Sequence, residues 1–299
     1  MDQPTTICFI GLGVMGGRMA RRLVDAGHHV VVFDNQPSAI KALVDAGATS
    51  ADRPADAAAN SDIIMTSLPA GEQVGEVMGG QDGILAGVKP GSTLVDLSTI
   101  GPEWASRLAK DAASHGVTML DAPVGGGWKD AEEGNLVIMV GGESAALDGV
   151  RTILEVLSSA LFHFGGPGTG QAAKLALNMS QAVMTVGAAE AVRLLRALGA
   201  DLPTFLETLE SLDANPWFQR PLRHTIEGAY PAGFRVSLAL KDARLATQSG
   251  KSAGVSLPGG ELARDLLNKA LDAGMGEEHF SAIVKLYDAD APKEPKTVS

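Results

Sequence analysis

The sequence has one cysteine, few basic residues and no long hydrophobic run. With Cys8 alone among 299 residues, the chain can form neither an intrachain disulfide nor a cysteine-based metal cluster. The apolar neighbours of Cys8, Ile7 and Phe9, indicate a small buried side chain. No apolar run reaches the length of a membrane span, and no signal peptide or arginine-rich transit segment precedes the first expected strand. These absences favour a cytoplasmic protein with no membrane partner.

The shortage of positive charge also limits the partners. Acidic residues outnumber basic ones by 35 to 24, and the formal net charge is −11. A negative surface disfavours nucleic acid and anionic lipid as partners, because both repel it. It does not restrict a small anionic substrate, whose site is set by local groups. With 45% hydrophobic residues the chain has a sizeable core, and its length suits one large domain or two ordinary ones.

The first half of the chain alternates short apolar segments with segments of helical patterning. Runs of Val, Ile and Leu of this length are typical of strands buried on both faces of a parallel sheet. The pattern predicts strands at 6–10, 29–33, 63–67, 93–97, 117–120 and 136–140, and helices at 14–26, 37–46 and 102–115. Each of these helices ends at a glycine, which stops helices readily. Residues 1–165 are therefore expected to form a doubly wound α/β domain of the Rossmann type, which binds a dinucleotide.

The pattern changes at the helix-breaking residues 165–168, which read Gly-Gly-Pro-Gly. The proline-free segment 169–196 that follows would extend roughly 40 Å as a helix, which is enough to bridge two domains. Further helices are predicted at 203–211, 216–227, 237–249 and 257–273. Residues 166–299 are therefore expected to form an all-helical domain that begins with a long interdomain helix. The substrate site is expected at the domain junction, and the polar tail from Ala289 is expected to be loose.

Residues 11–16 form a glycine-rich loop with the pattern G-x-G-x-x-G. The loop follows an expected strand and opens an expected helix, as dinucleotide binding requires. Gly11 allows a tight turn, Gly13 lets the backbone approach a pyrophosphate, and Gly16 lets helix and strand pack closely. The helix N-terminus then offers N–H groups to the phosphates. The predicted cofactor loop consists of Gly11, Leu12, Gly13, Val14, Met15 and Gly16.

Asp34 closes the next expected strand, where a carboxylate accepts hydrogen bonds from the adenosine ribose hydroxyls. The same carboxylate would repel a 2′-phosphate, and the residues after it, 35–37, include no arginine to bind one. The sequence therefore predicts NAD as the cofactor rather than NADP.

The predicted long helix carries a lysine near its start. Lys174 and Asn178 are four residues apart and share one helix face, on which Gln171 also lies. A lysine that is partly desolvated at a domain junction has a lowered pKa, which suits it to proton transfer. Taken alone, however, a lysine on a helix is most often a solvated surface residue.

Four motifs occur together in the order and spacing of one family. Besides the glycine loop, they are Asp96-Leu97-Ser98-Thr99 followed by 121–127 (Asp-Ala-Pro-Val-Gly-Gly-Gly), the segment 168–178, and Phe234 with Lys241-Asp242. On these motifs, from residue 7 to about residue 287, the chain resembles the β-hydroxyacid dehydrogenases, which include 3-hydroxyisobutyrate dehydrogenases and tartronate semialdehyde reductases. The resemblance implies an NAD-dependent oxidoreductase that acts on a small 3-hydroxy acid or aldehyde acid.

The resemblance also implies a role for each matching residue. Lys174 would be the general acid in reduction and the general base in oxidation, and Asn178 would hydrogen-bond the reacting part of the substrate. Thr99 would contact the substrate or the nicotinamide ribose. The other implied positions are Gly125, Gly126 and Gly127 for the substrate, and Leu68, Pro69, Phe234 and Lys241 for the cofactor and the closing of the site. Members of the family often form dimers or tetramers through their helical domains, so a homo-oligomer is expected.

Two positions depart from the family pattern. Gly125 replaces the usual serine, and Asp130 replaces the usual glycine. Neutral change in a loop and a different substrate shape both explain these departures, so assignment to 3-hydroxyisobutyrate itself stays open at this point.

Two other functions fit the same scaffold. Imine reductases of similar fold usually lack the lysine at the position of Lys174, and a nucleotide-binding protein without catalysis would be expected to have replaced it. The six histidines show no metal-ligand spacing and are interpreted as surface or packing residues, so no metal site is predicted. Trp217 and Phe218 are interpreted as packing anchors in preference to substrate contacts.

Overall fold

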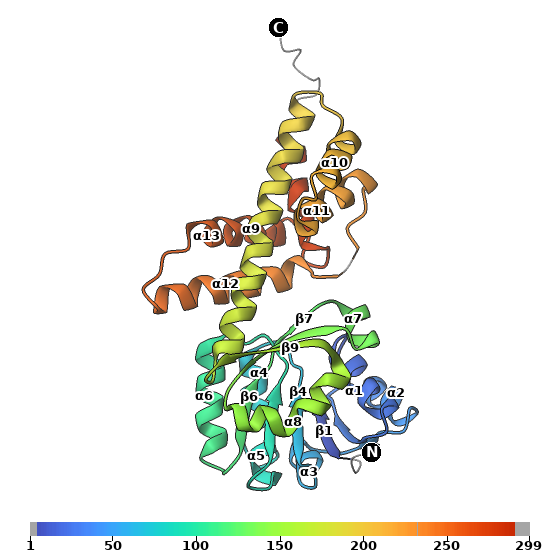
Figure 1. Ribbon diagram of the computed structural model, residues 1–299, viewed down its shortest axis with the longest axis vertical. Coiled ribbons are helices and arrows are strands. Elements are labelled where there is room, and N and C mark those ends of the chain that lie inside the picture. Colours follow the sequence, from blue (N-terminus) through green and yellow to red (C-terminus); the bar gives the residue numbers. More distant parts are fainter. Residues whose placement is uncertain (1–4, 232, 291–299) are drawn as a thin grey trace. The chain divides into compact units, whose positions relative to one another are not determined.

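The computed structural model describes residues 5–231 and 233–290, which fall into two compact units, Met1–Lys174 and Leu175–Ser299 (Figure 1). All the strands belong to the first unit, whereas the second unit is built from helices. The long helix α9 (Thr169–Ala197) begins in the first unit, and its residues from Leu175 onward belong to the second. The first turns of α9 are thus part of the α/β unit.

The first unit contains a nine-stranded sheet within the described residues, in the order β3-β2-β1-β4-β5-β6-β8-β7, with β9 paired to β8. The strands are β1 (Thr6–Ile10), β2 (His29–Phe33), β3 (Thr49–Ser50), β4 (Ile63–Thr66), β5 (Thr93–Asp96), β6 (Thr118–Asp121), β7 (Val124–Gly125), β8 (Leu136–Gly141) and β9 (Ser158–Gly165). All six predicted strands are confirmed, with ends that differ by one residue at most. β3, β7 and β9 were not predicted.

The expectation of a parallel sheet is confirmed for β1 to β6 and is wrong beyond them. β8 runs antiparallel to β6 and β7, and it is parallel to β9. The physical reason is the short connection from β7 to β8, because a parallel return needs a crossover of a dozen or more residues. Residues 126–135 are too few for such a crossover and allow only the antiparallel return.

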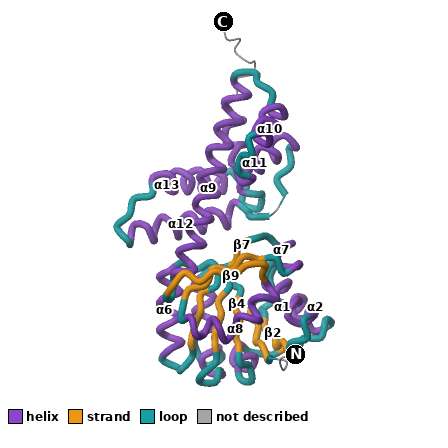
Figure 2. Tube along the Cα trace, in the orientation of Figure 1, coloured by secondary structure: helices purple, strands orange, loops and turns teal. Residues whose placement is uncertain are grey.

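Helices cover both faces of this sheet, as Figure 2 shows for the strands between them. One face packs against α1 (Gly16–Asp25), α2 (Pro37–Val44), α7 (Trp128–Glu133) and α8 (Ser144–Leu157), and the other against α3 (Pro54–Ala58), α4 (Gly71–Met78), α5 (Ile84–Gly87) and α6 (Pro102–Ala113). In β1, Ile7 and Phe9 join one core while Cys8 and Ile10 join the other, because alternate strand residues face opposite sides. Cys8 is fully buried, as predicted, and this burial raises the pKa of its thiol.

The second unit packs the rest of α9 with α10 (Leu202–Ser211), α11 (Pro216–Glu227), α12 (Val236–Ser252), α13 (Pro258–Asp272) and the 3-10 helix η1 (Phe280–Asp290). Its five predicted α-helices are confirmed, but η1 was not predicted. Ala188, Val192, Leu240 and Leu267 lie in its core. Residues 291–299 of the tail lie outside the described residues. Across the described part of the chain, no helix is long and apolar enough to span a membrane.

Two histidines of this unit, the half-buried His224 and the buried His279, confirm the packing interpretation. Nδ1 of His224 lies 2.9 Å from Ser281 Oγ, and Nδ1 of His279 lies 2.8 Å from the same oxygen. The backbone N–H of Ser281 also donates to His279 Nδ1, which requires that nitrogen to be unprotonated. Burial lowers the pKa of His279 to about 3, so this ring is neutral near pH 7 and acts as a structural acceptor.

Candidate active site

The glycine loop after β1 has two glycines that the fold itself requires. Gly11 has φ +90°, and a Cβ on it would lie 2.4 Å from the carbonyl oxygen of Ser67. A Cβ on Gly16 would lie 2.0 Å from the carbonyl oxygen of Gly11. Gly13 is different, since a Cβ there would meet nothing within 4 Å. Of the three glycines, Gly13 therefore leaves open space beside the backbone, as a bound pyrophosphate would need.

Asp34 lies just after β2 and is fixed by the same loop. Its Oδ2 accepts the backbone N–H of Leu12 at 2.6 Å, and its Oδ1 accepts that of Gln36 at 2.7 Å. These bonds orient the carboxylate beside the glycine loop, and each oxygen keeps a lone pair for a ribose hydroxyl. The residues present thus fit a dinucleotide.

The Ser98 segment, which follows β5, is held by a buried carboxylate. Asp96 Oδ1 accepts the hydroxyls of Thr66 at 2.7 Å and Ser98 at 2.6 Å. Ser98 Oγ in turn accepts the backbone N–H of Leu68 at 2.8 Å. The network links two predicted site segments, Leu68-Pro69 and Thr99, at the carboxyl ends of neighbouring strands, where open α/β sheets bind their ligands.

A second buried carboxylate, Asp121, holds the start of α9. It lies opposite Asp96 in the β5–β6 register. Its Oδ1 accepts the backbone N–H of Gly168 at 2.7 Å, and its Oδ2 accepts that of Gln171 at 2.9 Å. Burial raises the pKa of Asp121 to about 6, although these two N–H groups act to lower it. The carboxylate caps the N-terminus of the helix that carries Lys174, where negative charge is favourable.

Gln171 joins α9 to the Ser98 segment. Its side-chain Oε1 accepts the backbone N–H groups of Ile100 at 2.9 Å and Gly101 at 3.1 Å, and its Nε2 donates to the carbonyl of Ser98 at 2.8 Å. Gln171 is fully buried. Lys174, three residues further along α9, is half-buried.

Asn178 lies in the second unit and has a partner that sequence reasoning missed. Its Nδ2 donates to Asp242 Oδ2 at 2.6 Å, and both side chains are buried. The ammonium of Lys241 lies 3.2 Å from the other Asp242 oxygen. Asp242 was visible only as the neighbour of Lys241 in a motif. The pairing uses one of the two N–H groups of the Asn178 amide. Phe234 packs edge-on against Phe280 in the same unit.

The glycine segment 125–127 is shaped by Asp130. The carboxylate of Asp130 accepts the backbone N–H of Gly127 at 2.6 Å and caps α7. Gly126 has φ +115°, and a Cβ on it would lie 3.0 Å from Asp130 Cβ. Asp130, which replaces the glycine usual in the family, therefore occupies the Gly127 N–H and places a negative charge beside Gly126.

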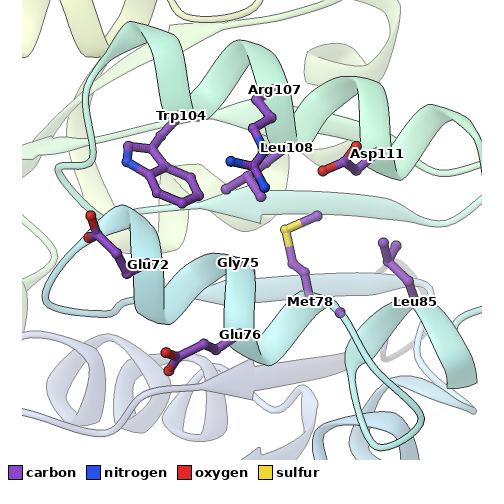
Figure 3. Close-up of a pocket in the computed structure, with 10 residues that line it drawn as sticks. Glu72, Gly75, Glu76, Met78, Leu85, Trp104, Arg107, Leu108 and Asp111 are labelled. Carbon is purple, nitrogen blue, oxygen red and sulfur yellow. The ribbon is translucent and has the colours of Figure 1, made fainter.

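A surface hollow of about 370 Å³ lies between α4 and α6, away from these residues. Figure 3 shows Trp104 and Arg107 of α6 above Gly75 of α4. A Cβ on Gly71 would lie 2.4 Å from the Trp104 ring, so the glycines of α4 accommodate the indole. The lining of the hollow shares no residue with the predicted site, and we interpret it as a by-product of helix packing.

The comparisons with known proteins cover nearly the whole chain. The model of the NAD-binding domain of 6-phosphogluconate dehydrogenase matches residues 6–166, and that of the NAD-binding region of NADP-dependent 3-hydroxyisobutyrate dehydrogenase matches residues 168–287. The chain belongs to the β-hydroxyacid dehydrogenase family. It is therefore an NAD-dependent hydroxy acid oxidoreductase, and the family predicted from the four motifs is confirmed.

Individual relatives support this assignment. The chain is 39% identical to a 3-hydroxyisobutyrate dehydrogenase of Pseudomonas aeruginosa over 95% of its length and 98% of the relative. It is 37% identical to an NAD-dependent L-serine dehydrogenase of the same organism, over 94% and 97% of the two chains. A structure of Mycobacterium tuberculosis 3-hydroxyisobutyrate dehydrogenase with L-serine superposes with a TM-score of 0.88, at 34% identity, covering 95% of this chain and 99% of the other.

The glycine geometry predicts that one alanine substitution weakens cofactor binding and that another lowers stability. Gly13→Ala should fold as the wild type does but bind NADH about tenfold or more weakly, a loss of about 1.4 kcal/mol, because its methyl group enters the open space beside the loop. Gly16→Ala should lower the free energy of unfolding by about 1–3 kcal/mol, because its Cβ meets the carbonyl of Gly11. NADH fluorescence titration and urea unfolding measure the two effects. Unchanged NADH affinity in Gly13→Ala would show that the pyrophosphate does not lie there.

Proposed function

We propose that Lys174 is the general acid and base for hydride transfer between the nicotinamide and a small 3-hydroxy acid. The observation that carries this proposal is the attachment of the first turns of α9 to the Ser98–Gly101 segment through Gln171. When bound, the nicotinamide takes up or supplies the hydride. In oxidation, neutral Lys174 accepts the proton of the substrate hydroxyl as the carbonyl forms, and in reduction its ammonium donates a proton to the carbonyl oxygen.

Asn178 and Thr99 orient the substrate in this proposal. The second N–H of the Asn178 amide, whose first N–H binds Asp242, donates to the oxygen of the substrate hydroxyl and leaves the hydroxyl proton for Lys174. Thr99 follows Ser98, whose position is fixed by Asp96, and it contacts the substrate or the nicotinamide ribose. Leu68, Pro69, Phe234 and Lys241 are assigned to the cofactor in this proposal. Only interactions that strengthen in the transition state raise kcat. Among these residues, Lys174 should therefore make the largest contribution to kcat, through proton transfer.

The substrate is proposed to be bulkier than the smallest acids of its class. Gly125 is buried in β7 and has no side chain where the family usually has a serine, and Asp130 occupies the N–H of Gly127. A small carboxylate therefore has fewer donors and a nearby negative charge, and we propose that a larger substituent takes the place of the missing serine side chain. Relatives of the chain are named for activity on 3-hydroxyisobutyrate, L-serine and 2-(hydroxymethyl)glutarate, substrates that cover a range of sizes.

The protein is further proposed to be a cytoplasmic homodimer or homotetramer that associates through its second unit. Leu194, Leu198 and Leu212 of that unit are each more than half exposed. Leu194 and Leu198 are one helical turn apart and therefore lie side by side, as adjacent apolar side chains of an association surface would.

Replacing Lys174 tests the proposed catalytic role. Lys174→Met keeps the length of the side chain but has no proton to donate, so kcat should fall by about 10²–10⁴-fold. NADH binding, followed by fluorescence, should be unchanged because the cofactor loop is intact. A variant that retains near-normal turnover would refute the assignment.

The geometry of Asp34 predicts cofactor choice. A hydrogen bond to a charged group contributes about 1.5–3 kcal/mol, and the carboxylate repels a 2′-phosphate. The kcat/KM for NAD should therefore exceed that for NADP by about tenfold or more. Asp34→Ser should reduce this ratio, whereas Asp45→Ser, on the exposed end of α2, should leave it unchanged. Equal kcat/KM values for the two cofactors in the wild type would contradict the prediction.

Substrate size is tested by the ratio of kcat/KM for a bulky and a small 3-hydroxy acid. The ratio should exceed one in the wild type and fall in Gly125→Ser, which restores the missing serine side chain and its hydroxyl donor. Gly149→Ser, on the open surface of α8 where a Cβ meets nothing within 4 Å, is the control and should leave the ratio unchanged. A wild-type preference for the small acid would contradict this account of Gly125.

A further inference from the structure

The start of α9 is seated on the ends of two strands with no space between them. A Cβ on Gly170 would lie 2.4 Å from the carbonyl oxygen of Met139, and one on Gly141 would lie 2.6 Å from Asp121 Oδ1. Interiors packed at this density transmit small displacements to their neighbours. The first turn of α9 therefore has one position on the sheet. That position fixes where the backbone of Lys174 lies.

Asp121 makes the polar contacts between the start of α9 and the sheet. Its two oxygens accept separate N–H groups of the helix start, those of Gly168 and Gln171. Hydrogen bonds to an ionised acceptor are roughly twice as strong as neutral ones. A water molecule or an uncharged side chain in its place would bind these N–H groups more weakly. The charge of Asp121 therefore matters as well as its shape.

Gln171 supplies the link to the neighbouring segment. Three hydrogen bonds from one fully buried side chain fix the backbone of Ser98, Ile100 and Gly101, and Thr99 lies between them. Gln171 is one helical turn before Lys174, and its own backbone N–H is bound by Asp121. Gln171 is thus bound by Asp121 through its backbone and holds the Thr99 segment through its side chain.

We propose that Asp121 and Gln171 are positioning residues of the reaction, which together fix Lys174 relative to the Thr99 segment. This inference rests on the proposed role of Lys174. Neither residue needs to touch the substrate; they act by keeping the proton donor and the segment beside it in one geometry. Misplacement of a catalytic group by about 1 Å costs about 10²-fold in rate, so loss of either residue should lower kcat.

The protonation of Asp121 provides a readout that a purely structural role would not share. On the strands paired with β6, the charged side chain is Asp96 of β5, since β8 has none, and Lys174 is the charged residue in the first two turns of α9. The two helices that pack on β6 also carry charged residues: Glu103, Arg107, Lys110 and Asp111 of α6, all exposed, and Asp148, Arg151 and Glu155 of α8. Burial and Asp96 raise the pKa of Asp121 to about 6, whereas the bound N–H groups lower it. As the pH falls through about 6, the carboxylate gains a proton and loses its charged bonds to α9. The wild-type kcat for reduction of the carbonyl substrate, in which Lys174 acts as an ammonium, should therefore decline below that pH.

The experiment compares Gln171→Met, Asp121→Asn and a control, Thr169→Ala, in the full chain. Gln171→Met keeps the side-chain length without its three hydrogen bonds, and Asp121→Asn keeps the shape without the charge. Thr169→Ala removes only the bond from Thr169 Oγ1 to the carbonyl of Gly166 at the same helix end. We expect kcat to fall about 10²-fold in Gln171→Met with KM for NAD unchanged. Amide hydrogen exchange should accelerate at Ile100 and Gly101, and Thr169→Ala should match the wild type.

The Asp121→Asn variant is measured over the pH range. Its kcat should be low and should lack the wild-type decline below about pH 6. The inference is overturned if Lys174→Met is inactive while Gln171→Met and Asp121→Asn retain wild-type kcat. It is also overturned if kcat falls only in proportion to a lowered melting temperature, or if Thr169→Ala falls equally. An active Lys174→Met variant would instead show that the proposed function has failed.

Discussion

The ionic capping of α9 by Asp121 is the interaction on which the candidate site depends. Two N–H groups at the helix start meet one buried carboxylate at the end of β6. Because Gln171 is one of the two donors, the same contact places the side chain that holds the Ser98–Gly101 segment. The helix that carries Lys174 is thereby part of the α/β unit at its start, even though most of its length belongs to the helical unit.

The cofactor side follows a separate constraint, which is steric. Gly11 and Gly16 are needed because the loop packs against itself and against Ser67, whereas Gly13 keeps open space for a ligand. Asp34 connects the loop to the end of β2 through the N–H of Leu12. The two halves of the site are therefore built by different means: close backbone packing at the dinucleotide loop, and buried carboxylates at the ends of β5 and β6.

Much of this architecture could be predicted from local patterns. The main strands and the helices of the second unit are marked by buried apolar runs, glycine stops and proline starts, and the family follows from four motifs. β9 was missed because its residues are half-exposed and begin directly where α8 ends, so neither alternation nor a turn marks it. The reversal at β8 depends on connection length and on pairing with β6, which the apolar run of β8 does not encode.

The positioning contacts were harder to predict, because they join residues far apart in the sequence. Asp121 and Asp242 both stood inside recognised motifs, yet their partners lie 47 to 64 residues away. A buried aspartate is a polar residue whose role becomes visible only when its donors are known. Asp130 is similar: the sequence marked it as a departure, but only the structure shows that it takes the N–H of Gly127.

The proposed reaction is hydride transfer between NAD and a 3-hydroxy acid. The most direct test is the formation of NADH, followed by absorbance at 340 nm, when the protein is mixed with NAD and a panel of 3-hydroxy acids that differ in size. The account predicts NADH formation with members of this panel, faster with the bulkier acids. An enzyme that forms no NADH from any 3-hydroxy acid but oxidises NADH with a cyclic imine would contradict it.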